Sequence, residues 1–456
     1  MNVQVPTTKL KTDAKGQTYL KQLLERTQIT SDGGWLGEVR DRATAMVQEL
    51  GIPSSKDEEW RFTDLKPLRE TEFYPSQISQ LSLTTSLDNL GLTLPEAQQS
   101  RLVFVNGHYA PELSSTAAVP EGVWVGHLAD FPNSEQLRPY LSQQPGDREV
   151  FTALNTTSFP DAAVVWIPKN TEVETPLHLL FLATGEQQPT ISHPRCLVVA
   201  ERSSACTLIE EYVVAEREWC QQPVAEHPYF TNTVAEFWLQ ENAQMKHARI
   251  QREGTDAFHI GKNAVTQAKD SRYSCVTISA GARLARQHLE VFQTGTGTET
   301  TLDGLSMVCD QQLSDLHSLI SLNHPNGKAN QLHKCVIDDR AHSVFNGKIL
   351  VPQTAQQTNA SQLNRNLLLS RQGKVNTKPQ LEITADDVQC AHGATVSQLE
   401  SEELFYLQSR GLDLETSRNL LLDSFCREIL EKLPLPSLTT RLARCFACRT
   451  SETLFS

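Results

Sequence analysis

Short apolar pairs recur along the chain between about residues 195 and 395, and the two members of each pair lie two residues apart. Residues spaced in this way point to one side of a β-strand, so each pair predicts a short strand with one apolar side. Turn-forming residues such as Asn346-Gly347 separate the pairs, which follow one another about every 13–18 residues. The pairs are Val276/Ile278, Leu289/Val291, Leu305/Met307, Ile320/Leu322, Ile349/Val351, Leu367/Leu369 and Leu381/Ile383, with a weaker one near Val336.

This repeat predicts a mainly β fold in which strands coil into a solenoid, each turn burying its inward side chains against the next. A β-sandwich gives similar spacing, and periodicity alone does not exclude it. The solenoid is favoured because the pairs are short and numerous and continue for about 200 residues without a domain break. A solenoid needs covered ends and presents stacked strand edges to partners.

Helical patterns lie on both sides of this region. Residues 34–50 place Leu36, Val39, Ala43, Met46, Val47 and Leu50 on one helical face, and a second helix is expected at 17–27. Between 401 and 433, Leu421, Phe425, Ile429 and Leu433 recur every fourth residue, with Leu422 and Cys426 beside them. Gly411 ends a shorter helix before this stripe, and Pro434 follows it. These segments could cap the solenoid. Residues 76–100 show little pattern and are interpreted as a linker, and Asn106-Gly107 predicts a hairpin turn.

Composition narrows the class of protein. The chain has 456 residues and a net charge of −13, and no basic stripe of the kind that nucleic-acid binders carry. No apolar run approaches the roughly 18 residues of a membrane span, and the first residues lack the apolar core of a secretory signal. Ten scattered cysteines suit a reducing compartment. We therefore expect a cytoplasmic protein that binds neither nucleic acid nor membranes.

Sequence motifs for common enzymes are missing: there is no phosphate-binding loop, no dinucleotide-binding glycine motif, no zinc-protease motif and no serine-hydrolase elbow. Cys390 and His392 lie two apart on a predicted strand, where a thiolate and an imidazole suit zinc, iron or the edge of an iron–sulfur cluster. Two ligands do not fill such a site, so others would come from elsewhere, including another subunit. The alternative is a buried cysteine beside a hydrogen-bonded histidine. His333 and Cys335 repeat the spacing but are weak evidence for a metal site.

Two further groups are interpreted as structural. Asp338, Asp339 and Arg340 form the only compact acidic and basic group that a carbohydrate-active β-helix enzyme could use, and they are more simply a turn. Cys445 and Cys448 form a single C-x-x-C, which is half of a metal site, and are expected to be thiols on a tail helix. Trp60 and Phe62, in the acidic segment 57–65, predict either an anchoring segment or a loop pinned by its aromatic side chains.

Several longer stretches resemble one protein family. DDVQCAHGATV at 386–396 is followed by ELFYLQSRGL and LLLDSFCREIL, and this resembles the C-terminal signature of the SufB/SufD family. DEEWRFTDL at 57–65, FVNGHYAPELS at 104–114 and FTALNTTSFPDAAVVWIPKN at 151–170 are similar to SufD rather than SufB. The resemblance spans nearly the whole chain.

The resemblance implies a right-handed parallel β-helix between helical ends, and a scaffold role in iron–sulfur cluster assembly without enzymatic activity. It implies pairing with a SufB-like subunit through the last turns of the β-helix and binding of a SufC-like ATPase through the C-terminal helices, with a homodimer possible when the chain is alone. Cys390 and His392 would then be ligands of a transient cluster or iron shared with SufB, and no cofactor would be bound permanently. Residues expected at the ATPase interface are Leu404, Phe405, Tyr406, Arg410, Leu421 and Phe425.

The expected domains are an N-terminal helical region with its linker at 1–100, a β-helix core at 101–396 and a C-terminal helical domain at 397–456. Two other functions stay open at this point. One is the main cluster scaffold, as in SufB, which would hold a cluster by itself. The other is a free-standing β-helix enzyme that acts on carbohydrate.

Overall fold

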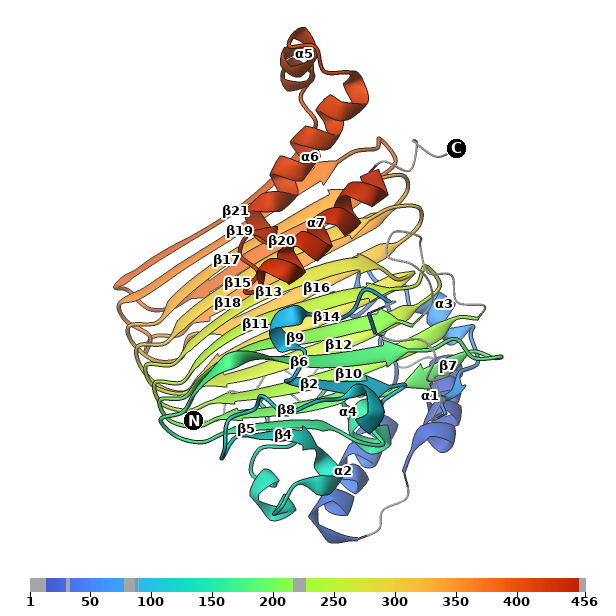
Figure 1. Ribbon diagram of the computed structural model, residues 1–456, viewed down its shortest axis with the longest axis vertical. Coiled ribbons are helices and arrows are strands. Elements are labelled where there is room, and N and C mark those ends of the chain that lie inside the picture. The colour runs from blue at the N-terminus through green and yellow to red at the C-terminus, as the bar shows by residue number, and fades with distance from the viewer. Residues whose placement is uncertain are drawn as a thin grey trace.

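A coil of parallel strands runs along the long axis of the molecule in the computed structural model, which describes residues 14–29, 33–77, 87–88, 90–146, 148–215 and 227–450 (Figure 1). One sheet has the order β20-β18-β16-β14-β12-β10-β8-β5-β4, with β1 and β7 beside it, and the other has the order β21-β19-β17-β15-β13-β11-β9-β6-β2-β3. From β8 onward, successive strands therefore alternate between the sheets, and one turn of the coil takes a strand from each. The predicted solenoid with helical flanks is confirmed, and the sandwich is excluded.

The strands of the first sheet are β1 (Tyr74–Pro75), β4 (Trp124–His127), β5 (Ala163–Ile167), β7 (Thr190–Ser192), β8 (Arg195–Ala200), β10 (Tyr229–Leu239), β12 (Phe258–Gln267), β14 (Leu284–Gln293), β16 (Leu313–Ser321), β18 (His342–Val351) and β20 (Lys374–Ile383). Those of the second are β2 (Arg101–Val105), β3 (His108–Tyr109), β6 (Glu172–Ala183), β9 (Ala205–Val214), β11 (Gln244–Glu253), β13 (Arg272–Gly281), β15 (Glu299–Val308), β17 (Lys328–Ile337), β19 (Thr358–Leu368) and β21 (Val388–Gln398).

The helices are α1 (Ala14–Thr27), α2 (Gly34–Leu50), α3 (Lys66–Arg69), α4 (Val150–Ser158), α5 (Ser401–Ser409), α6 (Leu414–Leu430) and α7 (Pro436–Thr450). Short 3-10 turns are η1 (Glu58–Trp60), η2 (Pro95–Ala97), η3 (Pro111–Leu113), η4 (Leu128–Asp130) and η5 (Ser134–Leu137). The helices expected at 17–27 and 34–50 are confirmed by α1 and α2. The Asn106-Gly107 turn joins antiparallel β2 and β3, with φ of 52° and 86° at its two central residues.

The apolar pairs of the repeat point in two directions rather than one. Leu289/Val291, Ile320/Leu322 and Ile349/Val351, all from the first sheet, face the interior of the coil. Val276/Ile278, Leu305/Met307 and Leu367/Leu369, from the second sheet, face outward against the C-terminal helices. The expectation that every pair points inward is therefore wrong for the second sheet. The reason is that α6 and α7 cover its outer face and give those strands a second apolar side.

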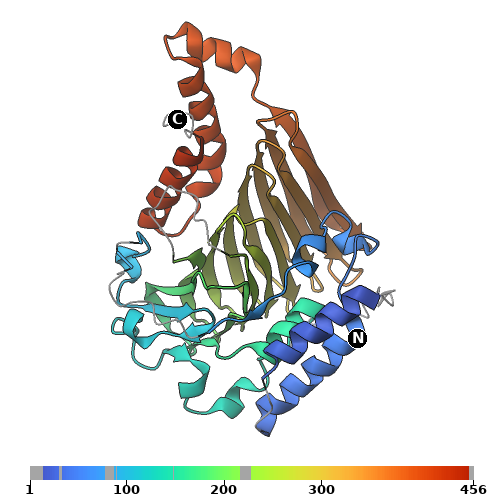
Figure 2. The ribbon, with the colours of Figure 1, turned by 90° about the vertical axis from the view of Figure 1, so that its right-hand side faces the viewer.

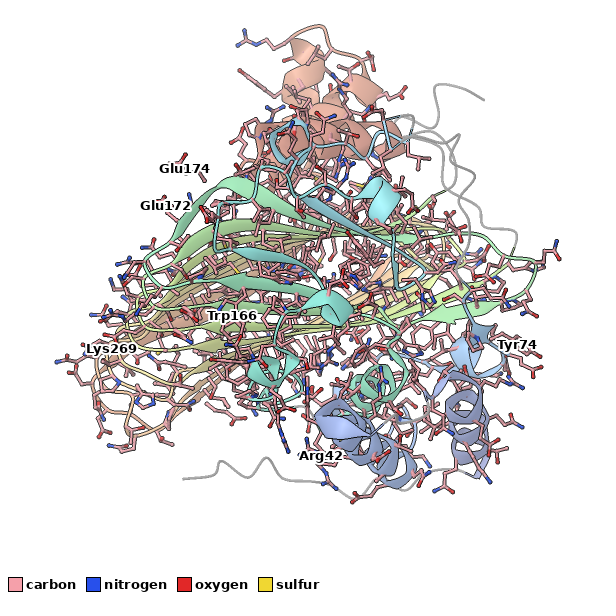
Figure 3. All side chains as sticks on the ribbon, turned by 60° about the horizontal axis from the view of Figure 1, so that its bottom comes forward. Arg42, Tyr74, Trp166, Glu172, Glu174 and Lys269 are labelled. Carbon is pink, nitrogen blue, oxygen red and sulfur yellow. The ribbon has the colours of Figure 1, made fainter. Side chains whose placement is uncertain are left out.

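The corners of the coil are tight and polar. Asn242, Asp270 and Asp310 sit at corners between strands with φ of 57°, 57° and 53°, a left-handed conformation that asparagine and aspartate tolerate better than most residues. Charged side chains such as Glu174 of β6 and Lys269 beside Asp270 are exposed to solvent (Figure 3). The asparagine and aspartate residues at the corners therefore allow the tight turns by which the chain passes from one strand to the next.

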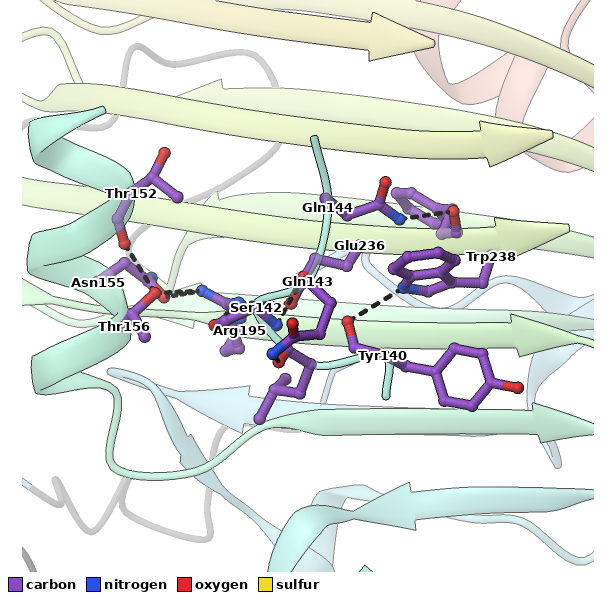
Figure 4. A network of polar contacts seen from close by, with 12 residues as sticks. Tyr140, Ser142, Gln143, Gln144, Thr152, Asn155, Thr156, Arg195, Glu236 and Trp238 are labelled. Atoms are coloured by element: carbon purple, nitrogen blue, oxygen red, sulfur yellow. Dashed lines mark hydrogen bonds and ion pairs between the residues drawn. The ribbon is translucent and has the colours of Figure 1, made fainter. Parts of the chain in front are cut away.

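α4 and the loop after Tyr140 pack on the outer face of the first sheet, and buried Arg195 at the start of β8 holds them there (Figure 4). Its guanidinium donates to Asn155 Oδ1 at 3.1 Å and Thr156 Oγ1 at 3.0 Å on α4, to Ser142 Oγ at 2.8 Å, and to the carboxylate of Glu236. These four acceptors compensate both terminal nitrogens of the buried guanidinium, so Arg195 fixes α4 and the loop after Tyr140 to β8 and β10.

The C-terminal helices pack on the opposite side of the coil, on the outer face of the second sheet (Figure 2). Leu422, Cys426, Ile429 and Leu430 of α6 are buried there, whereas Leu421 and Phe425 are only half-buried at the margin. A strict spacing of four drifts around a helix of 3.6 residues per turn. The buried face therefore combines Ile429 and Leu433 of the predicted row with Leu422 and Cys426 beside it. Cys445 and Cys448 lie on α7, and their side chains are outside the described residues.

Candidate functional site at the open end of the solenoid

The last turn of the coil, formed by β20 and β21, has no covering element among the described residues. β20 pairs with β18 and β21 pairs with β19, and neither strand has a described neighbour on its other edge. β21 lies at the end of the stack with α5 beyond it (Figure 1). The side chains of β21 are exposed or half-buried along its whole length, and Val396 is 49% exposed. Backbone groups on such an edge are available to pair with another strand.

The two strands differ in how they protect this edge. β20 carries Lys374, Lys378, Pro379 and Glu382, the residue types with which proteins commonly block edge pairing. β21 reads VQCAHGATVSQ and contains neither a charged residue nor a proline. An uncharged, fully extended edge strand of 11 residues is a surface suited to strand pairing and costly to leave open in solution. The edge of β21 is therefore the surface of the solenoid that is best suited to a partner.

Cys390 and His392 lie on this strand, as predicted, on the side that faces the interior of the coil. Val388 and Cys390 pack against the interior apolar cluster, and alternation along the strand gives His392 the same side. Cys390 is half-buried and His392 is exposed. Burial raises the pKa of the Cys390 thiol. Among the described residues, the ring of His392 makes no hydrogen bond, so both groups lie at the rim of an open end rather than sealed inside.

The residues beneath this rim form a polar ladder. His392 lies opposite Gln362 of β19, and Gln362 lies opposite Gln331 of β17. Gln362 is buried and donates to Gln331 Oε1 at 2.8 Å. This ladder positions His392 by register and leaves its imidazole as the outermost member.

The other pairs considered from sequence lie elsewhere. His333 and Cys335 are both buried inside the coil, where burial lowers the pKa of His333 to about 3 and raises that of Cys335 to about 11. Asp338 and Asp339 form the corner between β17 and β18, with φ of 46° at Asp339. Asp338 also pairs with Arg418 of α6 at 3.3 Å. These contacts are those of a turn, as expected.

The sequence did not reveal a group of polar side chains that face the interior in the middle turns of the coil. Glu210, His247 and Cys275 lie on neighbouring strands of the second sheet and face the interior, with His247 Nε2 3.0 Å from Glu210 Oε2 and His247 Nδ1 3.6 Å from Cys275 Sγ. Burial alone would raise the pKa of Glu210, but the hydrogen bond and charge of His247 and the charge of Arg249 hold it at about 2. Burial alone would lower the pKa of His247, but Cys275 and Glu210 raise it to about 9. Alternating polar residues in a strand read as solvent-facing, so no sequence signal separates them from surface residues.

Because of Glu210 and His247, we expect the free energy of unfolding to fall at both low and high pH. The contribution of Glu210 is present above its unfolded pKa near 4.3 and is lost as the pH falls toward about 2. The contribution of His247 is present below its unfolded pKa near 6.5 and is lost as the pH rises toward about 9. We expect the urea midpoint of the wild-type chain to be highest at about pH 4.5–6.5, with roughly 3 kcal/mol lost at the acid end through Glu210. Glu210→Gln should flatten the acid limb, and an unchanged acid limb would contradict this assignment.

The residues expected at an ATPase interface fall into two groups. Phe405 and Tyr406 on α5 are 71% and 58% exposed, and Arg410 lies over the Tyr406 ring at 5.3 Å. Leu404 is half-buried. Leu421 and Phe425 lie at the margin of the α6 packing surface, where Lys334 Nζ is 4.4 Å from the centre of the Phe425 ring. Two residues that the sequence did not single out, Leu414 and Leu420, are 56% and 49% exposed beside α5.

Fold and site together define the class: a parallel β-solenoid with helical flanks, whose open end carries a thiol and an imidazole on an uncharged edge strand. Residues 181–425 match the family model described as the SufBD core domain of SUF system iron–sulfur cluster assembly, and residues 16–179 match the SufBD N-terminal region. The chain therefore belongs to the SufB/SufD family of iron–sulfur cluster assembly proteins. Among the described helices, none combines the length and the hydropathy that crossing a bilayer requires.

Curated relatives agree with this assignment and point to its SufD branch. An iron–sulfur cluster assembly SufBD family protein of Synechocystis is 45% identical over 94% of this chain and 95% of its own length. The chloroplastic protein ABCI7 of Arabidopsis thaliana is 37% identical over 88% of this chain and 83% of its own. The iron–sulfur cluster assembly protein SufD of Escherichia coli is 30% identical over 86% of this chain and 88% of its own.

Proposed function

We propose that this chain is a non-catalytic accessory scaffold subunit of a Suf-type assembly complex, and that β21 pairs with the corresponding edge of a SufB-like subunit. The observation that carries the proposal is the uncharged, open edge of β21 with Cys390 and His392 at its rim. A strand from a second solenoid would satisfy the free backbone groups of that edge and continue the coil. When the chain is alone, a second copy can take the same place.

The proposed cargo is a transient iron–sulfur cluster, or iron on its way to one. Thiolate and imidazole are ligands that iron accepts, and two of them leave coordination positions for groups from the partner. Cys390 is half-buried beside the interior cluster, while His392 is exposed. In this proposal His392 is a ligand at the seam, the interface between β21 and the SufB-like subunit, and Cys390 is the second ligand. A seam that opens and closes would control access to both.

Co-expression with the SufB-like and SufC-like proteins of the same organism tests the proposal. We expect one complex that contains this chain and both partners, with the subunit stoichiometry measured by native mass spectrometry. Purification of this chain free of both partners would contradict it.

Anaerobic reconstitution of the chain alone addresses the role of a main cluster scaffold: a stable cluster on the isolated chain, seen in its absorption spectrum, would contradict the accessory role. A cytoplasmic location stays part of the proposal, since one relative is named as chloroplastic.

The exposed apolar residues of α5 and the first part of α6 are the proposed docking surface for a SufC-like ATPase. Phe405 and Tyr406 are exposed on α5. This helix lies at the far end of the molecule from the N-terminal helices (Figure 2). Exposed aromatic side chains on a protruding helix are the residues most often responsible for binding energy at interfaces. Phe405 is the better probe than Phe425, because Phe425 also packs within the chain.

Phe405→Asp is expected to weaken binding of the SufC-like ATPase at least about tenfold, because an interface aromatic commonly contributes 2 kcal/mol or more. The measurement is the dissociation constant by surface plasmon resonance or calorimetry. Gln408→Asp introduces the same charge at an exposed position of the same helix and should have a small effect. Equal affinities for Phe405→Asp and wild type would place the docking surface elsewhere.

A further inference from the structure

A second cluster of ligand-type side chains lies away from the open end, on the outer face of the first sheet. His288 of β14 and His317 of β16 are opposite one another in the strand register, and their ring centres are 5.1 Å apart. Glu59 of η1 lies over them. One ligand atom from each of the three residues lies within 4.8 Å of the other two.

His317 is oriented by carboxylates on both of its nitrogens. Its Nε2 is 3.0 Å from Asp315 Oδ1, and its Nδ1 is 3.0 Å from Glu59 Oε2. Asp315 is buried and held in turn by the Arg286 guanidinium and by the hydroxyl of Thr63. A carboxylate that accepts the proton of one ring nitrogen leaves the other nitrogen free to bind a metal, as in many zinc sites. Asp315 therefore takes the position of the orienting carboxylate, and Glu59 the position of a ligand.

The charges around the cluster leave one carboxylate in excess. Arg286 pairs with Asp315, Lys262 Nζ is 3.0 Å from Glu290, and Lys378 Nζ is 2.5 Å from Glu58. Glu59, by contrast, bonds to His317 alone among the described residues. Within the described chain, Glu59 is thus the carboxylate of this group without a lysine or arginine partner, and a metal ion there would take the place of the proton between Glu59 Oε2 and His317 Nδ1.

His288 is available as the third ligand. Its ring makes no hydrogen bond within the described part of the chain, and its side chain lines a cavity of about 10 Å³ together with Trp60 and Lys262, room for about one water.

We propose that Glu59, His288 and His317 form a binding site for a single divalent transition-metal ion of the zinc class, which clamps the segment Asp57–Leu65 to the solenoid. Two imidazoles, one carboxylate and one open position are a ligand set that zinc commonly adopts. Bonds of about 2.0–2.1 Å place neighbouring ligand atoms roughly 3.3 Å apart in a tetrahedral site. The 3.0 Å between Glu59 Oε2 and His317 Nδ1 is close to that separation, so a small movement of His288 would complete the set. The site does not depend on the role proposed for β21.

The segment that the ion would hold joins distant parts of the molecule. Trp60 packs against Phe151 of α4 at 5.5 Å and under the Arg286 guanidinium at 3.8 Å. Glu58 reaches Lys378 on β20, in the last turn. An ion bound at Glu59 would thus fix the N-terminal region across β14, β16 and, through Glu58, the turn that ends the coil.

The test uses the full chain, freed of metal by chelation, and Zn²⁺ as the probe in equilibrium dialysis and calorimetry. Wild type should bind one more zinc ion than Glu59→Gln and His288→Asn, or bind it at least about tenfold more tightly. Glu59→Gln keeps an acceptor for His317 at an exposed position, so its fold is expected to persist, and Glu58→Gln is the matched control that should bind as wild type does. Zinc should raise the unfolding temperature of wild type and Glu58→Gln but not of Glu59→Gln.

Cobalt separates this site from the cysteines. Co²⁺ on two histidines and a glutamate gives visible d–d absorption without the near-ultraviolet thiolate band, and Glu59→Gln should lose that d–d signal. No zinc bound by the wild type would overturn the proposal and leave an ion-pair clamp. Equal zinc binding by wild type and Glu59→Gln would overturn it as well, since the ion would then lie elsewhere.

Discussion

His392→Ala is expected to reduce cluster maturation by the co-assembled complex at least about tenfold, while the complex itself still forms. His392 is exposed and makes no hydrogen bond within the described chain, so its removal should change the free energy of unfolding by less than about 0.5 kcal/mol. Cluster maturation should fall because the imidazole is the proposed iron ligand at the seam. Changes around a metal commonly cost tenfold or more in metal affinity. The measurement is iron and acid-labile sulfide per complex after anaerobic purification.

Two variants on the same strand sharpen this result. Gln389→Ala is a matched control, because Gln389 is exposed on β21 but has the opposite side-chain direction from Cys390 and His392. Cys390→Ser should give a partial or complete loss and so reports whether the thiol is the second ligand. Full maturation with His392→Ala would exclude the ligand role. Loss of soluble protein would instead show that His392 supports the packing of the last turn.

Glu211→Gln is expected to destabilise the chain by about 3–5 kcal/mol, the cost of leaving a buried charge without its partner. Glu211 lies on β9 under α7 and is fully buried, with both of its oxygens bonded to Arg441 Nη2 at 2.5 and 2.6 Å and one of them 3.2 Å from His178 Nε2. Burial alone would raise the pKa of this carboxyl, but Arg441, His178 and Arg252 hold it well below its usual range. The carboxylate is therefore charged at neutral pH, and the amide would remove the negative charge that Glu211 places beside the buried guanidinium of Arg441.

The urea midpoint and hydrogen exchange along α7 measure this effect. Because Arg441 belongs to α7, exchange in that helix should rise more than exchange in β12 or β14. Glu299→Gln is the control: Glu299 pairs with Arg272 at 3.3 Å and Lys328 at 3.1 Å on the surface, and such exposed pairs contribute less than about 1 kcal/mol. Similar losses for the two variants would contradict the part assigned to Arg441 in joining α7 to the solenoid.

The solenoid itself could be predicted from the chain, because paired apolar residues such as Leu289/Val291 return at a nearly regular spacing and no helical period interrupts them. Which way each pair points could not be predicted. Val276/Ile278 and Leu289/Val291 look alike in sequence, yet the first faces α6 and α7 and the second faces the interior. The difference is set by helices more than 100 residues further along the chain, and local hydropathy contains no information about what covers a sheet.

Some of the candidate site residues could likewise be identified from sequence and others could not. Cys390 and His392 were singled out because a thiol and an imidazole lie two apart on one predicted strand, and the resemblance to the family then favoured a ligand role. The polar group of Glu210, His247 and Cys275 and the cluster of Glu59, His288 and His317 are each assembled from separate turns. His317 meets Glu59 across 258 positions of sequence, and only the strand register brings His288 beside them. Residues that the coil brings together across turns leave no local spacing to recognise.

The pairing of β21 with a second solenoid is tested most directly by amide hydrogen exchange along residues 388–398, with and without the SufB-like subunit. The outer-edge amides of β21 should exchange fast in the isolated monomer and become protected by at least about tenfold in the complex, while β12 and β14 stay unchanged. Protection on α5 but none on β21 when the complete complex forms would contradict the pairing and move the interface away from Cys390 and His392.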